Sequence, residues 1–268
     1  MPREGAEFRI PLRSLVLPGY GQYLYGAVGQ GLAFTSLALG GYALATTGDP
    51  SGYAPRDVRD QLAYEGLHLA LTAGMLSAWD AFHRALPAQR GAGRYRFFNP
   101  PDDDVGDLLS APFDIRFLGR WTTLVDLAFT AGVTTWVLTE DEDDGPYRPY
   151  RWHDAAFATS LSLNAAAGEE ALFRGWLLPM LTQKLGGRFW LANFIQAGIF
   201  GLLHPQAGEY ALVIGADALY SGWQTRRDGW SVREAIFQHF WYDPAVATAE
   251  LLRDDRGVVT LLPITIRL

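Results

Sequence analysis

The stretch GLAFTSLALGGYALA at residues 31–45 decides the fold class of this chain. It lies within 35 consecutive positions, residues 14–48, that carry no charged side chain. A bilayer core of ~30 Å is crossed by about 20 apolar residues in a helix. Small residues within the run, such as Gly40 and Gly41, would let helix backbones approach closely in lipid. The stretch therefore predicts a membrane-spanning helix.

Similar runs recur along the 268-residue chain. A second charge-free run covers residues 189–208, and shorter ones cover 66–79, 127–139 and 155–168. Helices are therefore predicted at 22–46, 62–86, 117–139, 154–184, 189–204, 209–226 and 231–252. The sequence predicts an all-α fold, a polytopic transmembrane bundle with about 6–8 membrane helices. A large soluble helical protein is the alternative, because its buried helices can also lack charge.

The distribution of charge predicts how the chain is divided and oriented. Arginines precede the first span and cluster at 84–120, whereas residues 140–146 are mostly acidic. By the positive-inside tendency, the N-terminus and the 84–120 loop face the cytoplasm. The first span is too long for a cleaved signal sequence. We expect a membrane hairpin with a cytoplasmic loop at 1–110, a core at 111–268, and a location in a cell membrane.

Overall composition excludes several classes of function. The chain has 22 basic and 29 acidic residues, a formal net charge of −7. A nucleic-acid partner is therefore not expected, since such binding needs a basic surface. Cysteine is absent, which excludes disulfides, iron–sulfur clusters, thiolate metal sites and a cysteine nucleophile.

Ionisable residues inside the predicted spans are the main functional signal, because each is costly in lipid. Structural pairing or a span boundary accounts for Asp80, Asp126 and Asp217, which stand singly. The remaining ones form a pattern on three spans: Glu169, Glu170, Arg174, His204, His239 and Asp243.

The first motif is GEEALFRG at residues 168–175. Arg174 stands four residues after Glu170, on the same helix face, where an ion pair forms readily. Adjacent side chains of a helix point about 100° apart. Glu169 is therefore directed elsewhere, and we expect it to act as a base in a water-poor site.

The other two motifs each contain a histidine. Phe200 and His204 are four residues apart, as are His239 and Asp243, so each pair shares one helix face. No Ser or Cys stands beside these motifs as a nucleophile, which leaves activated water. The water could be held by Glu169 and His204, or by a divalent metal such as zinc bound to His204, His239 and a glutamate. The sequence leaves both mechanisms open.

The three motifs in this order resemble the CPBP family of intramembrane proteases, which includes CAAX prenyl endopeptidases and bacteriocin-processing or immunity-associated relatives. The resemblance covers roughly residues 115–252. It implies that Glu169 activates water with His204 as its partner, while Glu170, Arg174 and Phe200 support the site. His239 and Asp243 would stabilise the oxyanion or complete a metal site that includes Glu169, His204 and His239. Position 243 is often Asn in the family, which leaves the role of Asp243 less defined.

The resemblance implies a membrane-embedded metallo- or glutamate-dependent endopeptidase that hydrolyses a peptide bond of a peptide or protein substrate at the lipid bilayer. The alternative is a non-proteolytic membrane protein of the same fold, acting as a scaffold, immunity factor or transport accessory. In that case the motif charges would only hold the helices together.

Overall fold

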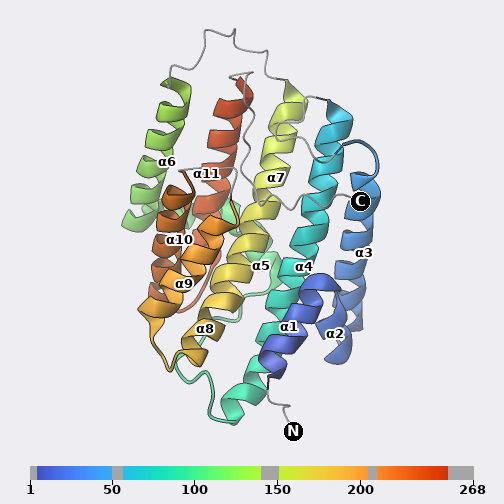
Figure 1. The fold of residues 1–268 in the computed structure, drawn as a ribbon, viewed down its shortest axis with the longest axis vertical. Helices are drawn as coiled ribbons and strands as arrows, with labels where there is room; N and C mark the ends of the chain where they lie inside the picture. Colours follow the sequence, from blue (N-terminus) through green and yellow to red (C-terminus); the bar gives the residue numbers. More distant parts are fainter. Residues whose placement is uncertain (1–4, 50–56, 140–150, 205–209, 253–268) are drawn as a thin grey trace.

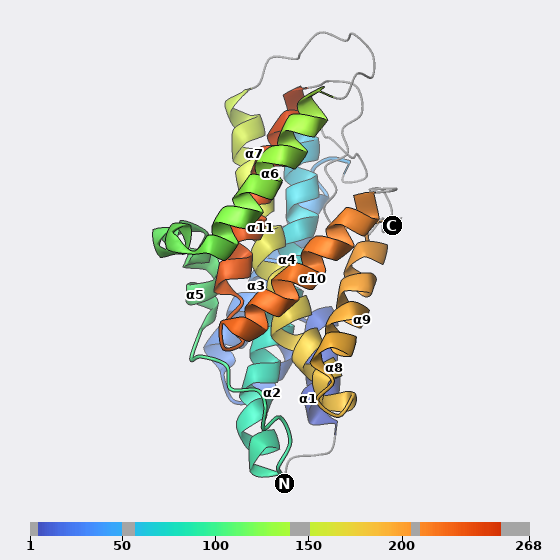
Figure 2. The ribbon, with the colours of Figure 1, turned by 90° about the vertical axis from the view of Figure 1, so that its left-hand side faces the viewer.

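A computed structural model of the chain describes residues 5–49, 57–139, 151–204 and 210–252. Every regular element in this described part is helical, which confirms the all-α prediction. Helices α4 (Val58–Gly91), α7 (Trp152–Glu170) and α11 (Arg233–Leu252) run roughly along the long axis of one elongated bundle (Figure 1, Figure 2). Helices α6 (Trp121–Thr139) and α10 (Tyr210–Arg227) are inclined to this axis in the second view (Figure 2). The acidic segment at 140–150 and the chain end after residue 252 lie outside the described residues.

The N-terminal part consists of α1 (Ala6–Val16), α2 (Tyr20–Leu24), α3 (Val28–Ala45) and α4 (Val58–Gly91). The prediction of one helix over 22–46 was wrong, because the chain turns between α2 and α3. Gly26 makes this turn with a φ of 77°, a conformation that favours glycine.

Glycines bring α3 and α4 into close contact. A Cβ atom on Gly41 would lie 2.5 Å from the carbonyl oxygen of Gly66. Side chains at these positions would force the two backbones apart, so the small residues serve the close packing that the sequence indicated.

A short helix, α5 (Val105–Ser110), and two 3-10 turns connect α4 to α6 (Trp121–Thr139). Asp104 caps α5, because its side chain accepts a hydrogen bond from the backbone N–H of Asp107. The second 3-10 turn, Ile115–Gly119, occupies the residues at which a helix beginning at 117 was predicted.

The predicted helix over 154–184 is divided into three pieces. Regular α7 (Trp152–Glu170) changes at Ala171 into a π-helix, η3 (Ala171–Leu177), and α8 (Leu178–Lys184) follows. Pro179 has no N–H to donate to the carbonyl of Gly175, so one hydrogen bond of a regular α-helix is missing there. Single π turns of this kind are frequent at functional sites.

The last three helices are α9 (Phe189–Leu202), α10 (Tyr210–Arg227) and α11 (Arg233–Leu252). They match the predicted ranges closely, although α9 ends two residues before His204. Pro244 lies inside α11, directly after Asp243. Helix α11 packs against both α7 and α6 (Figure 1, Figure 2).

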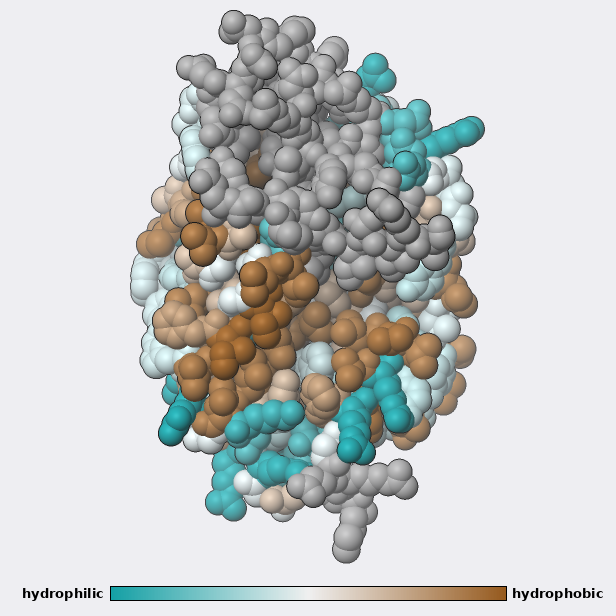
Figure 3. Space-filling view, in the orientation of Figure 1, coloured by the Kyte–Doolittle hydropathy of each residue, from teal (hydrophilic) through white to brown (hydrophobic). Residues whose placement is uncertain are grey.

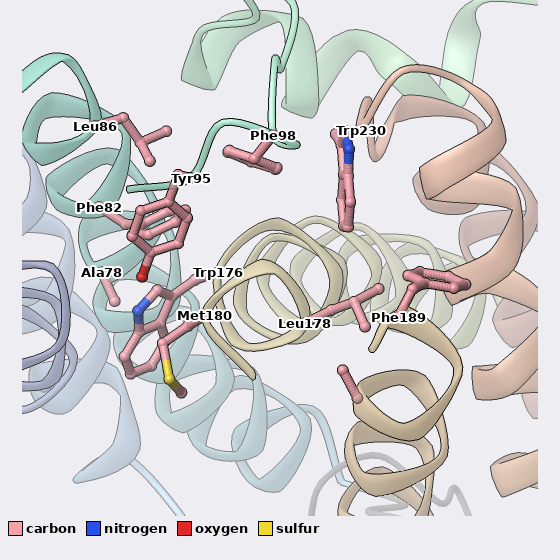
Figure 4. Packing of buried hydrophobic residues seen from close by; sticks show 11 residues of the cluster. Ala78, Phe82, Leu86, Tyr95, Phe98, Trp176, Leu178, Met180, Phe189 and Trp230 are labelled. Atoms are coloured by element: carbon pink, nitrogen blue, oxygen red, sulfur yellow. The ribbon is translucent and has the colours of Figure 1, made fainter. Parts of the chain in front are cut away.

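The largest apolar cluster joins the N-terminal helices to the C-terminal half. Figure 4 shows Phe82 of α4 beside Tyr95, and Trp176 of η3 close to both, with Phe98 and Trp230 completing an aromatic group. The rings of Phe98 and Trp230 are 5.1 Å apart, within the range of favourable aromatic pairs. This cluster fixes η3, and thereby Arg174, against α4.

The surface carries many apolar side chains. Figure 3 shows them across the middle of one face, with hydrophilic side chains below. Leu202 at the end of α9 is 80% exposed and Leu212 of α10 is 82% exposed. Among the residues that the structure describes, no helix is both long enough and apolar enough to pass through a bilayer.

Candidate active site

The junction of α7 and η3 holds the first motif. Glu169 and Glu170 are the last two residues of α7, and Arg174 lies one turn later within η3. All three side chains are about 1% exposed. Nη1 of Arg174 lies 3.1 Å from Oε1 of Glu170, so the predicted ion pair is present. The contact is electrostatic, since its angles do not suit a hydrogen bond.

The aromatic ring of Phe200 links this motif to the second one. The guanidinium carbon of Arg174 lies 4.4 Å from the centre of the Phe200 ring, a distance at which a cation–π interaction stabilises the buried charge. The ring of His204 lies 4.7 Å from the same ring.

His204 follows the end of α9 and is 3% exposed. Its Nδ1 lies 2.7 Å from the carbonyl oxygen of Phe200. Because a carbonyl oxygen only accepts hydrogen bonds, Nδ1 carries the proton in this contact. Nε2 of the neutral ring is then left with its lone pair, which can accept a hydrogen bond or a proton.

His239 of α11 connects the first and third motifs. Its Nδ1 lies 2.9 Å from Oε1 of Glu170. Its Nε2 lies 3.4 Å from Oδ2 of Asp243 and 4.0 Å from Oε2 of Glu169. The two adjacent glutamates therefore do point in different directions, and both reach the same histidine ring.

A small cavity of about 40 Å³ opens beside His204 and His239, with room for only a few water molecules. Glu169 and Glu170 are not among its lining residues, although both approach His239. The lining comes from α6, α9, α10 and α11: Asp126, Phe129, Phe200, His204, Val213, Ile214, Asp217, Ser221, Gln238, His239, Tyr242 and Asp243.

The structure thus brings all seven predicted site residues into one region and adds others. Asp126 of α6 and Asp217 of α10 line the same cavity and share a side-chain hydrogen bond. The sequence marks both as isolated charges in apolar runs, but it does not indicate that they meet. Their position in the cavity is the feature that sequence reasoning missed.

The His, Asp and Glu side chains of the site are the possible ligands of a divalent metal. Zinc sites require three or four closely spaced protein ligands. Within the described residues, no three His, Asp or Glu side chains are arranged to hold a metal ion.

Comparison with known proteins finds a match to one family model. Residues 151–244 match the family model described as type II CAAX prenyl endopeptidase Rce1-like. No curated protein and no solved structure matches the chain significantly. The matched segment contains all three motifs, from Glu169 to Asp243. Over residues 151–244, the chain is therefore similar to type II CAAX prenyl endopeptidases of the Rce1-like family.

Proposed function

We propose that the protein is an intramembrane endopeptidase that hydrolyses a peptide bond with a water molecule activated by Glu169 and His204. The family match supports a CAAX-type protease acting on a peptide or protein substrate. The observation that carries the proposal is the convergence of α7, α9 and α11. His239 approaches both glutamates, while His204 lies across the Phe200 ring.

In the proposed reaction, Glu169 takes a proton from water as the oxygen attacks the substrate carbonyl carbon. A carboxylate at a water-poor site is suited to this transfer. His204, with Nδ1–H held by the Phe200 carbonyl, accepts a hydrogen bond from the same water through Nε2. When the C–N bond breaks, Glu169 returns the proton to the leaving amine.

His239 is the proposed donor to the oxyanion. Preorganised donors at this position commonly contribute the largest part of the rate enhancement. Glu170 fixes the ring through Nδ1, and Arg174 in turn fixes Glu170. Asp243 lies 3.4 Å from Nε2, and we assign it the role of orienting His239.

A membrane location is supported by the family, whose members are membrane proteins. The exposed apolar side chains of α9 and α10 also support it, because patches of this kind mark contact with lipid or protein. We propose that the helices around the site are embedded in a bilayer, which for a bacterial chain would be the inner membrane.

The experiment that tests the proposal compares protein N-termini in membranes of the native host. Wild type, Glu169→Gln and His204→Ala would be expressed at matched levels, with Glu65→Gln as the control glutamate on α4. We expect new N-termini in the wild type and the control, and their loss in the two site variants.

Identical N-termini in all four strains would contradict proteolysis. The site charges would then be a structural network, and the search would turn from cleavage products to binding partners. A scaffold tolerates the isosteric Glu169→Gln change in its biological role, whereas a protease does not.

A further inference from the structure

The cavity beside His239 contains buried acceptor atoms without donors. Within the described part of the chain, no donor forms a hydrogen bond with Oδ2 of Asp126, Oε1 of Gln238 or Oδ2 of Asp243. All three residues line the cavity, and Asp126 is only 7% exposed. A buried acceptor without a donor is costly. A bound group that donates hydrogen bonds would satisfy these acceptors.

The cavity is also acidic. Carboxyl groups enter it from three helices, with Asp126 on α6, Asp217 on α10 and Asp243 on α11, and none of its described lining residues is Arg or Lys. The carboxyl groups of Asp126 and Asp217 lie within hydrogen-bonding reach of each other. The second oxygen of Asp126 stays available to a further donor.

We propose that Asp126 and Asp217 form a subsite that binds the positively charged head of a basic residue of the substrate. The inference rests on the proposed protease function, because it places this residue beside the reacting bond. It assigns a specificity role to two aspartates that the sequence attributes to structural pairing or a span boundary.

Three features favour an organic cation over other occupants. The acceptors require N–H or O–H donors, which ammonium and guanidinium groups supply together with positive charge. The volume of about 40 Å³ suits a small head group. The described His, Asp and Glu side chains include no three-ligand metal set.

The position of the subsite predicts where the basic residue lies in the substrate. Asp126 and Asp217 share the cavity with His204 and His239. A lysine or arginine side chain spans only a few backbone positions, since consecutive Cα atoms are about 3.8 Å apart. We expect the basic residue within about two positions of the cleaved bond.

The test uses the full-length protein in detergent micelles and a mixed-sequence peptide library, with cleavage sites read by mass spectrometry. Individual lysine peptides would then be compared with matched norleucine peptides. We expect the wild type to prefer the basic peptides by about 10- to 100-fold, the range for hydrogen bonds to charged groups. This ratio should fall towards one in Asp126→Asn and Asp217→Asn. The control is Asp80→Asn, which alters a buried carboxyl of α4 that does not line the cavity.

A binding measurement separates failure of the subsite from failure of the protease assignment. Butylguanidinium should raise the thermal midpoint of the wild type, and neutral butylurea should not. The aspartate variants should lose this difference. Cleavage without a basic preference would overturn the subsite and leave the protease standing. Without any cleavage, the midpoints decide: equal effects of the two probes on the wild type would overturn the subsite.

Discussion

Two buried acidic clusters lie on neighbouring turns of α11, and they differ in how fully their carboxylates are satisfied. Glu234 begins the helix with a side chain that is 0% exposed. Its oxygens accept hydrogen bonds from a full set of donors, which are Arg120, Thr122, Thr123, Gln224 and Arg227. Five and nine residues further along the helix, His239 and Asp243 border a cavity in which several acceptors lack donors.

The difference separates a structural cluster from a functional one. A buried carboxylate whose oxygens already have donors, such as that of Glu234, stiffens the fold. A buried polar group that lacks a hydrogen-bond partner in a native structure requires an explanation, such as a ligand or a catalytic role. The first cluster ties α6, α10 and α11 together. The second is where we place substrate.

The largest effect on stability is expected for Arg174→Ala. This change leaves the fully buried Glu170 without its cation, and breaking a buried pair costs about 3–5 kcal/mol. Thermal unfolding in detergent would measure the loss, with the exposed Arg188→Ala as control. A midpoint equal to that of the wild type would show that the ion pair does not support the fold.

Glu234→Gln should have a smaller effect, about 2 kcal/mol, because it weakens several hydrogen bonds to a charged group. The side chains of Arg120 and Arg227 are 44% and 29% exposed, so water can replace part of what they lose. Unfolding of this variant would be compared with that of the exposed Asp102→Asn. If Glu234→Gln changed peptide preference while leaving stability intact, the division between the two clusters would be wrong.

Much of the fold follows from local patterns, and the exceptions depend on context. Charge-free runs predict where α4 and α9 begin and end to within a few residues. The sequence predicts no helix before residue 22, because α1 contains Pro11 and three charged residues. The π-helix could not be foreseen from apolar spacing, which only shows that residues 154–184 favour helix. It ends just before Pro179, which lies in the first turn of α8.

The contacts of the site are of two kinds: those between residues close in sequence, which spacing predicts, and those between distant residues, which it does not. Spacing of four residues correctly pairs Glu170 with Arg174, since both lie on one helix. The hydrogen bond between His239 and Glu170 joins residues 69 positions apart, and no spacing rule predicts it. The meeting of Asp126 with Asp217 is equally a product of tertiary packing.

Asp243 offers a finer test of the second cluster. If it orients His239, Asp243→Ala should lower kcat by about 10- to 100-fold with little change in KM, as is typical for groups that orient a catalytic residue. Asp243→Asn keeps a side-chain oxygen beside Nε2 of His239 and should retain activity within about tenfold of the wild type. Both rates would be measured on one cleaved peptide. Equal loss in the two variants would mean that the charge of Asp243 is itself required.

Chelation is expected to have the smallest effect. The reaction proposed here uses only Glu169, His204 and His239, so dialysis against a strong chelator should leave peptide cleavage within about twofold of its starting rate. Metal content and activity would be measured on the same sample, with zinc added back. Loss of cleavage that zinc restores would mean that these three side chains close around a metal, which requires His239 to exchange its carboxylate partners for the ion. That outcome would give the second cluster an occupant and would leave the saturated network around Glu234 unchanged.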